Sequence, residues 1–209
     1  MTLMEYFNIA PVASLIFVFT IITSLYAFYD HSIYGKFMLH PYTVSKGRNL
    51  YTILTSGLIH ADWMHLFFNM FTFYAFAFQL ESMMGSWRFG LMYFVALILS
   101  DIPTIFRHKD TFNYNSLGAS GAISAVVFSY ILYSPLTGLY LMFIPIPIPA
   151  IIFGVLYLFY CAYASRNARD HINHDAHLFG ALTGLIFTII FVPGILENFF
   201  TVIRTKLGI

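Results

Sequence analysis

The feature that most constrains this chain is a run of 21 residues, Ile9 to Tyr29, without a charged side chain. At about 1.5 Å of rise per residue, a helix of this length crosses the roughly 30 Å hydrocarbon core of a bilayer. The run is too long for the apolar core of a cleaved signal peptide, and no basic segment precedes it. We therefore expect it to be a retained first membrane span.

Five further apolar runs follow, each bounded by charged residues, proline or glycine. They are Trp63–Leu80, Phe89–Phe106, Gly118–Tyr133, Ala150–Ser165 and Ala176–Val192. Between the fourth and fifth spans, residues 143–150 contain alternating prolines, which cannot lie inside a helix. We therefore predict an extended connector there, with Pro149 near the start of the next helix. The sequence predicts an all-α polytopic membrane protein, a six-span bundle in a single domain over residues 1–209, with the fourth span near its centre.

Composition agrees with lipid as the solvent of this chain. Only 9% of the residues are charged and 59% are hydrophobic, whereas a soluble domain has about a quarter of its residues charged. A net charge of +1 and the lack of a basic run exclude nucleic acid as a partner. The single cysteine, Cys161, cannot form an internal disulfide.

Small residues open the fourth span and recur in the sixth. Gly118 and Gly121 begin the fourth span, and Gly180 and Gly184 form a GxxxG step in the sixth. Such faces allow two helix backbones to approach closely in lipid, where hydrophobicity gives no drive for association. We therefore expect the fourth and sixth spans to be in direct contact.

Polar residues inside the spans give the strongest functional signal, because such groups are costly in lipid and usually face the bundle interior. His65 and Asn69 are four residues apart on one face of the second span, Ser120 begins the fourth span and His177 begins the sixth. All even-numbered spans start on the same side of the membrane. The sequence thus predicts that these groups meet at one depth, with His60 in the turn before the second span, from where it can reach the same cavity. His60, Gly118 and Gly121 are predicted to help His65 and Asn69 position the oxyanion and the substrate.

This set of residues suits acyl transfer. A serine hydroxyl is a weak nucleophile until a base takes its proton, and neutral histidine is the usual base near pH 7. The Asn69 amide, the His65 ring and the Ser120 backbone N–H can stabilise the oxyanion that follows. No acidic third member is evident in the spans near His177, so a dyad of Ser120 and His177 is predicted rather than a triad.

The chain resembles the rhomboid intramembrane serine proteases in three motifs. The motifs are HxxxxHxxxN at His60, His65 and Asn69, GxSG at Gly118 to Gly121, and AHxxGxxxG at Ala176, His177, Gly180 and Gly184. The resemblance implies a rhomboid-like bundle in which Ser120 is the nucleophile, His177 the base, and His65 and Asn69 oxyanion donors. It also implies that the substrates are single-span membrane proteins, cut in or near the membrane without a metal or organic cofactor.

The chain departs from the family at two places. Ser124 stands where many bacterial members have a tyrosine that packs on the catalytic histidine, and Tyr51 and Thr52 stand where many have a Trp-Arg pair. The family topology implies a bacterial plasma (inner) membrane protein whose active site opens on the extracytoplasmic side. Lysine and arginine give the opposite orientation by the positive-inside rule, since most lie in the odd-numbered connectors.

Two other readings of the sequence remain open. His171, His174 and His177 are spaced three apart, as zinc ligands on a helix can be, although no HExxH motif is present and the first two lie in a charged connector. The second alternative is a non-catalytic rhomboid-like adaptor that binds membrane clients. Such relatives typically lack the serine or the histidine, and this chain has both.

Overall fold

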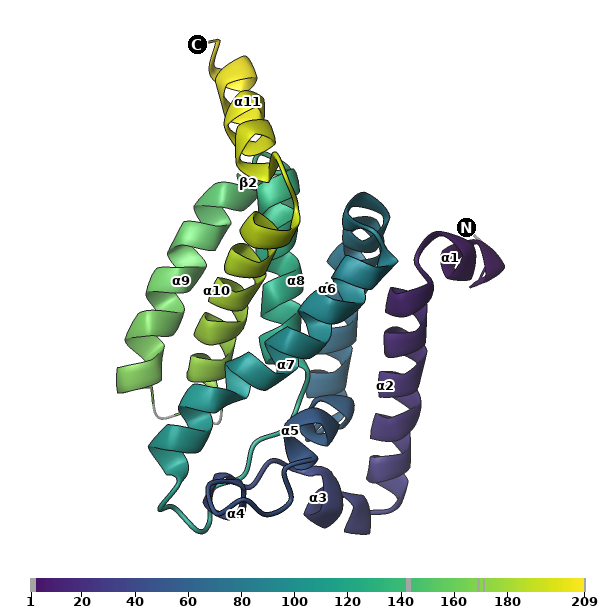
Figure 1. Ribbon diagram of the computed structural model, residues 1–209, viewed down its shortest axis with the longest axis vertical. Helices are drawn as coiled ribbons and strands as arrows, with labels where there is room; N and C mark the ends of the chain where they lie inside the picture. Colours follow the sequence, from purple (N-terminus) through teal and green to yellow (C-terminus); the bar gives the residue numbers. More distant parts are fainter. Residues whose placement is uncertain (1–2, 142–143, 169, 171, 209) are drawn as a thin grey trace.

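The computed structural model describes residues 3–141, 144–168, 170 and 172–208. It is mostly helical, as predicted, and Figure 1 shows long helices running side by side. The helices are α1 (Leu3–Ile9), α2 (Pro11–Tyr29), α3 (Ser32–Phe37), α4 (Pro41–Val44), α5 (Thr52–Thr55), the 3-10 turn η1 (Ser56–Leu58), α6 (Trp63–Met84), α7 (Ser86–His108), α8 (Ser120–Tyr133), α9 (Ala150–Asn167), α10 (His174–Phe191) and α11 (Ile195–Leu207).

The predicted apolar runs correspond to α2, α6, α7, α8, α9 and α10, with ends that differ by a few residues. In the part of the chain that the structure describes, α2, α7 and α10 are long and apolar enough to cross a membrane, and α8 is apolar but shorter. Large apolar side chains such as Phe19 and Phe159 are exposed on the outside of the bundle, as lipid requires. The chain is an integral membrane protein. That it crosses the membrane six times remains a prediction.

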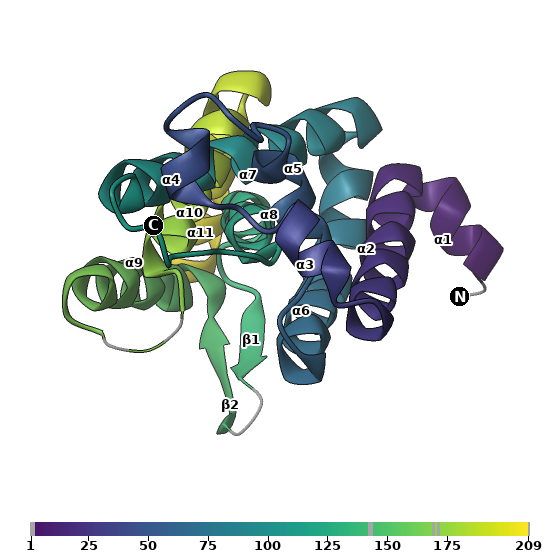
Figure 2. The ribbon, with the colours of Figure 1, turned by 90° about the horizontal axis from the view of Figure 1, so that it is seen from below.

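Helix α8 lies at the centre of the bundle, as expected, with α6, α7, α9 and α10 around it (Figure 2). Every residue from Gly121 to Leu132 is buried. Helices α6, α8 and α10 all begin at the end of the bundle that carries α3, α4 and α5 (Figure 1). The residues that open these three helices therefore lie at one level, which is where the sequence places the polar groups.

The amino end of α2 is capped by a distant carboxylate. Glu81, near the end of α6, is 1% exposed and accepts hydrogen bonds from the backbone N–H groups of Val12 (3.1 Å) and Ala13 (2.6 Å). A helix start leaves such donors unpaired and carries a partial positive charge, so a carboxylate there is stabilising. The first span begins later than predicted, because α1 ends at Ile9 and α2 starts with Pro11 in its first turn.

The connector between α2 and α6 touches the segment that precedes α8. Leu39 and Ser116 form a two-way backbone bridge, with N–H to oxygen distances of 2.9 Å in both directions. The backbone N–H of Gly118 also donates to the carbonyl of Ser56 at 2.9 Å. These contacts fix the turn from which α8 begins.

The extended connector before α9 forms half of a β-hairpin, which the all-α prediction omitted. Strand β1 (Gly138–Leu141) pairs antiparallel with β2 (Ile144–Pro149), with Gly138 opposite Pro149 and Leu139 opposite Ile148. Phe143, which began the predicted connector, lies outside the described residues. The prolines fit because an edge strand tolerates a missing backbone donor, and Pro149 directly precedes α9 as predicted.

Candidate active site

A cavity of about 1020 Å³ lies among α6, α7, α8, α9 and α10 at the end where the even-numbered helices begin. The predicted site residues that line it are His65, Asn69, Gly118, Ser120, Gly121 and His177. The fold thus brings residues from three distant parts of the sequence to one cavity. Its volume is at the upper limit of small-ligand sites, which have about 300–1,000 Å³.

Ser120 is the first residue of α8, and the turn before it requires glycine. Gly118 has φ +110°, which side chains rarely adopt, and a Cβ placed there would lie 2.7 Å from His65 Nε2. The His65 ring therefore packs directly against the turn that leads into Ser120. No side chain from the described residues caps α8, so its first backbone N–H groups are available to an anion.

Two contacts orient His65, one to its backbone N–H and one to its ring. The Asp62 carboxylate caps α6 by accepting the His65 backbone N–H at 2.8 Å. The Ala61 N–H makes a long contact of 3.5 Å to His65 Nδ1, which favours the tautomer with its hydrogen on Nε2. That nitrogen lies over Gly118, so the ring can present a donor beside the start of α8.

Asn69 lies one helical turn after His65 and is 7% exposed. Its Nδ2 donates to the His65 backbone carbonyl at 3.0 Å. A side-chain amide has two N–H donors, so one remains for a group in the cavity. Asn69 and His65 thus form a pair of potential donors on one face of α6.

His60 does not line the cavity and lies instead behind His65. It is 0% exposed, its Nδ1 is 3.0 Å from Ser24 Oγ, and its ring meets His65 edge-on with centroids 4.9 Å apart. Burial, with the neighbouring His65, lowers the pKa of His60 to about 3. A neutral, buried ring in this position supports His65 and has no access to a substrate.

Helices α8 and α10 are in backbone contact beside the cavity. A Cβ on Gly180 would lie 2.0 Å from the Gly121 carbonyl oxygen, and one on Gly184 would lie 2.2 Å from that of Ala125. The absence of side chains at these glycines therefore sets the distance between the two helices. Ser120 precedes the contact directly and His177 lies one turn before Gly180, so both face the same space.

His177 is half-buried, and the ring of a tyrosine packs against its imidazole. Tyr157 of α9 stacks on His177 with centroids 6.3 Å apart and an interplanar angle of 19°, and its hydroxyl is 3.1 Å from Ser124 Oγ. Ser124 was recognised as the site of a missing tyrosine, but only the fold shows that a ring from another helix covers His177. Within the described structure, no hydrogen bond joins Ser120 to His177; such bonds commonly tighten only when substrate is bound.

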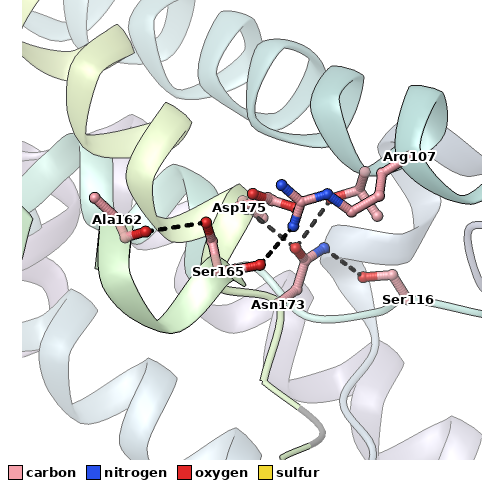
Figure 3. Close-up of polar contacts among 8 residues, drawn as sticks. Arg107, Ser116, Ala162, Ser165, Asn173 and Asp175 are labelled. Carbon is pink, nitrogen blue, oxygen red and sulfur yellow. Dashed lines mark hydrogen bonds and ion pairs between the residues drawn. The ribbon is translucent and has the colours of Figure 1, made fainter. Parts of the chain in front are cut away.

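The start of α10 is fixed by a polar network that the motifs do not reveal (Figure 3). Asn173 Oδ1 accepts from the Ala176 backbone N–H at 3.1 Å and from Thr104 Oγ1 at 3.0 Å, while its Nδ2 donates to Ser116 Oγ at 3.1 Å. One side chain thus joins α7, the segment before α8 and the first turn of α10.

An ion pair adds a fourth element to this network. Arg107 of α7 pairs with Asp175 and donates to the Ser165 carbonyl of α9 at 2.7 Å, as Figure 3 shows. Asp175 is therefore already paired and is not directed at His177. Asp101 of α7 also lines the cavity, a position that sequence reasoning did not identify.

The residues that could hold a metal differ from those the histidine spacing indicated. His171 lies outside the described residues. His174 is buried, and its Nε2 lies 3.1 Å and 3.2 Å from the two carboxylate oxygens of Asp170. Ligand atoms of Cys161, His174 and His177 lie within 4.8 Å of one another.

Comparison with known proteins identifies the family. A family model described as the Rhomboid domain matches residues 47–194. The chain is 32% identical over 144 residues to "Putative rhomboid protease YdcA" of Bacillus subtilis (strain 168), covering 67% of this chain and 66% of that protein. It is 26% identical over 170 residues to "RHOMBOID-like protein 12, mitochondrial" of Arabidopsis thaliana, covering 72% of this chain and 50% of that protein.

The chain thus spans between half and two thirds of the length of these two relatives. The match to the family model covers most of the chain and includes all three motifs around the cavity. The resemblance inferred from those motifs is confirmed, and the chain belongs to the rhomboid family.

Proposed function

We propose that this protein is an intramembrane serine endopeptidase that cuts single-span membrane proteins in or near their transmembrane segments. Rhomboid membership supports intramembrane proteolysis at the level of the family. The observation that carries the proposal is that Ser120, His177 and two potential oxyanion donors line one cavity.

In the first step, His177 takes the proton of Ser120 as Oγ attacks the scissile carbonyl carbon, which gives a tetrahedral intermediate. The negative oxygen accepts hydrogen bonds from the Ser120 backbone N–H, the His65 ring and the Asn69 amide. Removing one such donor typically costs about 10²–10³ in rate. The start of α8 adds a favourable partial positive charge.

In the second step, His177 returns the proton to the leaving amine and an acyl-enzyme on Ser120 remains. Water then attacks the ester with His177 again as base, and the released carboxylate leaves a free Ser120. The cavity provides space for that water, because polar side chains including Asp101, Asn113 and Asn115 also line it. No metal or organic cofactor has a part in this sequence.

The substrate helix has to unwind at the cut, because a regular helix keeps its carbonyl groups hydrogen-bonded. Small residues at the cleavage site and helix-weakening glycine or proline are consistent with this need. We place the protein in a bacterial plasma membrane with the cavity facing the extracytoplasmic side, following family topology. Protease accessibility of tags at both chain ends in sealed vesicles tests this orientation, and tags accessible from the extracytoplasmic side contradict it.

Cleavage by purified protein tests the dyad. The parent, Ser120→Ala and His177→Ala are incubated in liposomes with a transmembrane substrate, alongside Ser82→Ala and His31→Ala, which alter an exposed serine and an exposed histidine. We expect both dyad variants to lose cleavage at equal folded yield and both controls to keep it. Residual cleavage by Ser120→Ala excludes the mechanism. A parent that binds but cuts none of a range of substrates supports the adaptor alternative.

A further inference from the structure

Three side chains with metal-binding atoms gather on the α9 side of the site. Cys161 of α9 is 0% exposed and His174 of α10 is 4% exposed. Their ligand atoms and a ring nitrogen of His177 lie within 4.8 Å of one another. The proposed reaction uses only His177 of these three, so the other two need a separate explanation.

His174 is held in the state that a metal ligand requires. Its Nε2 faces the Asp170 carboxylate at 3.1 Å and 3.2 Å, which places the ring hydrogen on that nitrogen. Its Nδ1 is buried and has no hydrogen-bond partner in the described structure. Histidines that bind metals almost always donate their other ring N–H to a carboxylate or a carbonyl. The unpaired Nδ1 lone pair is thus oriented and unused.

One sulfur and two imidazole nitrogens suit zinc. Zn²⁺ prefers a tetrahedron of sulfur and nitrogen ligands with bonds of about 2.0–2.3 Å, which sets one sulfur and two nitrogens about 3.3–3.6 Å apart. The ligand atoms lie within 4.8 Å of one another, so they have to close by at most about 1.5 Å. The charge is also favourable, since a Cys161 thiolate and the Asp170 carboxylate together offset the two charges of the ion.

The cavity provides a path and a fourth position. It is lined by Tyr157, Ala164, His174 and His177 as well as by Ser120. A zinc ion therefore has a route from solvent through the cavity, and water can occupy its open coordination position. Three protein ligands with an open fourth position are typical of a reversible or reactive zinc site rather than a closed structural one.

We propose that Cys161, His174 and His177 form a zinc site, and that its occupation inhibits the enzyme reversibly. The inhibitory part rests on the proposed function of His177 as base. A neutral imidazole has one lone pair on one nitrogen and one hydrogen on the other. If zinc takes the nitrogen that faces Ser120, the base is blocked directly; if it takes the other, the nitrogen facing Ser120 carries the hydrogen. In both cases His177 cannot accept the Ser120 proton.

Cobalt spectroscopy tests the site without reference to activity. Cys161 is the single cysteine of the chain, so a thiolate-to-cobalt charge-transfer band on adding Co²⁺ has to come from this residue. We expect one equivalent of Co²⁺ to produce the band in the parent and in Ser120→Ala, and Zn²⁺ to remove it. Cys161→Ser should lack the band, and His174→Gln should require at least about tenfold more Co²⁺. Absence of the band in the parent overturns the proposal.

Inhibition of cleavage tests the consequence. Each protein is freed of metal with a chelator, and Zn²⁺ is titrated against its own metal-free rate. We expect the inhibitory concentration to rise at least about tenfold in Cys161→Ser or Cys161→Ala. His108→Gln is the matched control, since His108 lines the cavity outside the cluster, and it should be inhibited like the parent. Equal inhibition of the parent and the Cys161 variants overturns the proposed inhibition.

The two tests separate this proposal from the proposed function. If the parent cuts no substrate but shows the cobalt band, the zinc site stands and the protease assignment fails. If the parent cuts, lacks the band and is unaffected by Zn²⁺, the protease assignment stands and the zinc site fails.

Discussion

Helices α8 and α9 both contribute to the surroundings of His177, but the protein holds them in different ways. Helix α8 is buried along nearly its whole length, whereas α9 buries only Ala150, Gly154, Cys161 and Ala164. Ser120, the proposed nucleophile, lies on the buried helix, and the Tyr157 ring that packs on His177, the proposed base, lies on the exposed one. The alignment of His177 thus depends on a helix that the core holds less firmly than α8.

Glycines of α10 and α9 show the same contrast between firm and looser packing against α8, and adding a single methyl group at each tests it. At Gly180 an added Cβ would lie 2.0 Å from a backbone oxygen of α8, which cannot move without the helix. At Gly154 of α9 an added Cβ would lie 2.9 Å from Ile131 Cδ1, the flexible end of a side chain. Backbone contact therefore defines the α8–α10 pair, and side-chain contact defines the α8–α9 pair.

The largest effect is expected for Gly180→Ala. The methyl group forces α10 away from α8, at a cost of at least about 3 kcal/mol, the upper part of the usual overpacking range. We expect loss of most folded protein and of cleavage, measured by thermal unfolding in detergent and by substrate turnover. Gly154→Ala is the matched control and should retain both. Similar unfolding temperatures for the two variants contradict the difference between the helices.

Removal of the Tyr157 ring should act on catalysis more than on folding. Without the stacked ring His177 can rotate, and a displacement of about 1 Å in a catalytic group can cost 10²-fold in rate. We expect Tyr157→Ala to lower kcat by up to about 100-fold at nearly unchanged unfolding temperature, measured with the same membrane substrate. Phenylalanine keeps the ring and loses the hydroxyl, which contacts Ser124 and Cys161, so Tyr157→Phe should lose only about fivefold, as for a hydrogen bond of about 1 kcal/mol. Equal losses in the two variants would show that the stacking is unimportant.

The pH dependence of stability tests whether His60, which lies beneath His65, belongs to the firmly packed core. The pKa of His60 is about 3 in the folded protein, against an ordinary value of about 6.5. Between these values the unfolded chain binds a proton and the folded chain does not, so stability is full above pH 6.5 and falls as the pH drops. At pH 5 the loss is about 2 kcal/mol. We expect the unfolding temperature to fall between pH 7 and 5 in the parent and less in His60→Asn. The variant His31→Gln, at an exposed histidine, should behave as the parent. If the unfolding temperature of His60→Asn depends on pH as steeply as that of the parent, this would falsify the assignment of the effect to His60.

The sequence predicted the helices better than it predicted the contacts between them. Apolar runs locate helices because lipid allows little else, and the even-numbered starts locate the site because helices reverse direction at each crossing. Tyr157 and Asn173 escaped prediction because most of their partners are distant in the sequence: His177 is 20 residues from Tyr157, and Thr104 is 69 residues from Asn173. His60 fits a motif by its spacing alone. Only its burial in the fold shows that it supports His65 and does not contact substrate. The β-hairpin was missed because alternating prolines indicate extended chain without indicating its partner.

The cap of α2 has a consequence for the biogenesis of this protein. The acceptor for the Val12 and Ala13 N–H groups is Glu81, 69 and 68 residues later in the chain. When the ribosome has delivered α2 to the membrane, this acceptor has not yet been synthesised. Helix α2 therefore enters the bilayer with its start incompletely satisfied, and it reaches its final hydrogen bonding only when the end of α6 has been synthesised and packs beside it. The final capping of α2 and the arrival of α6 are thus coupled steps of assembly.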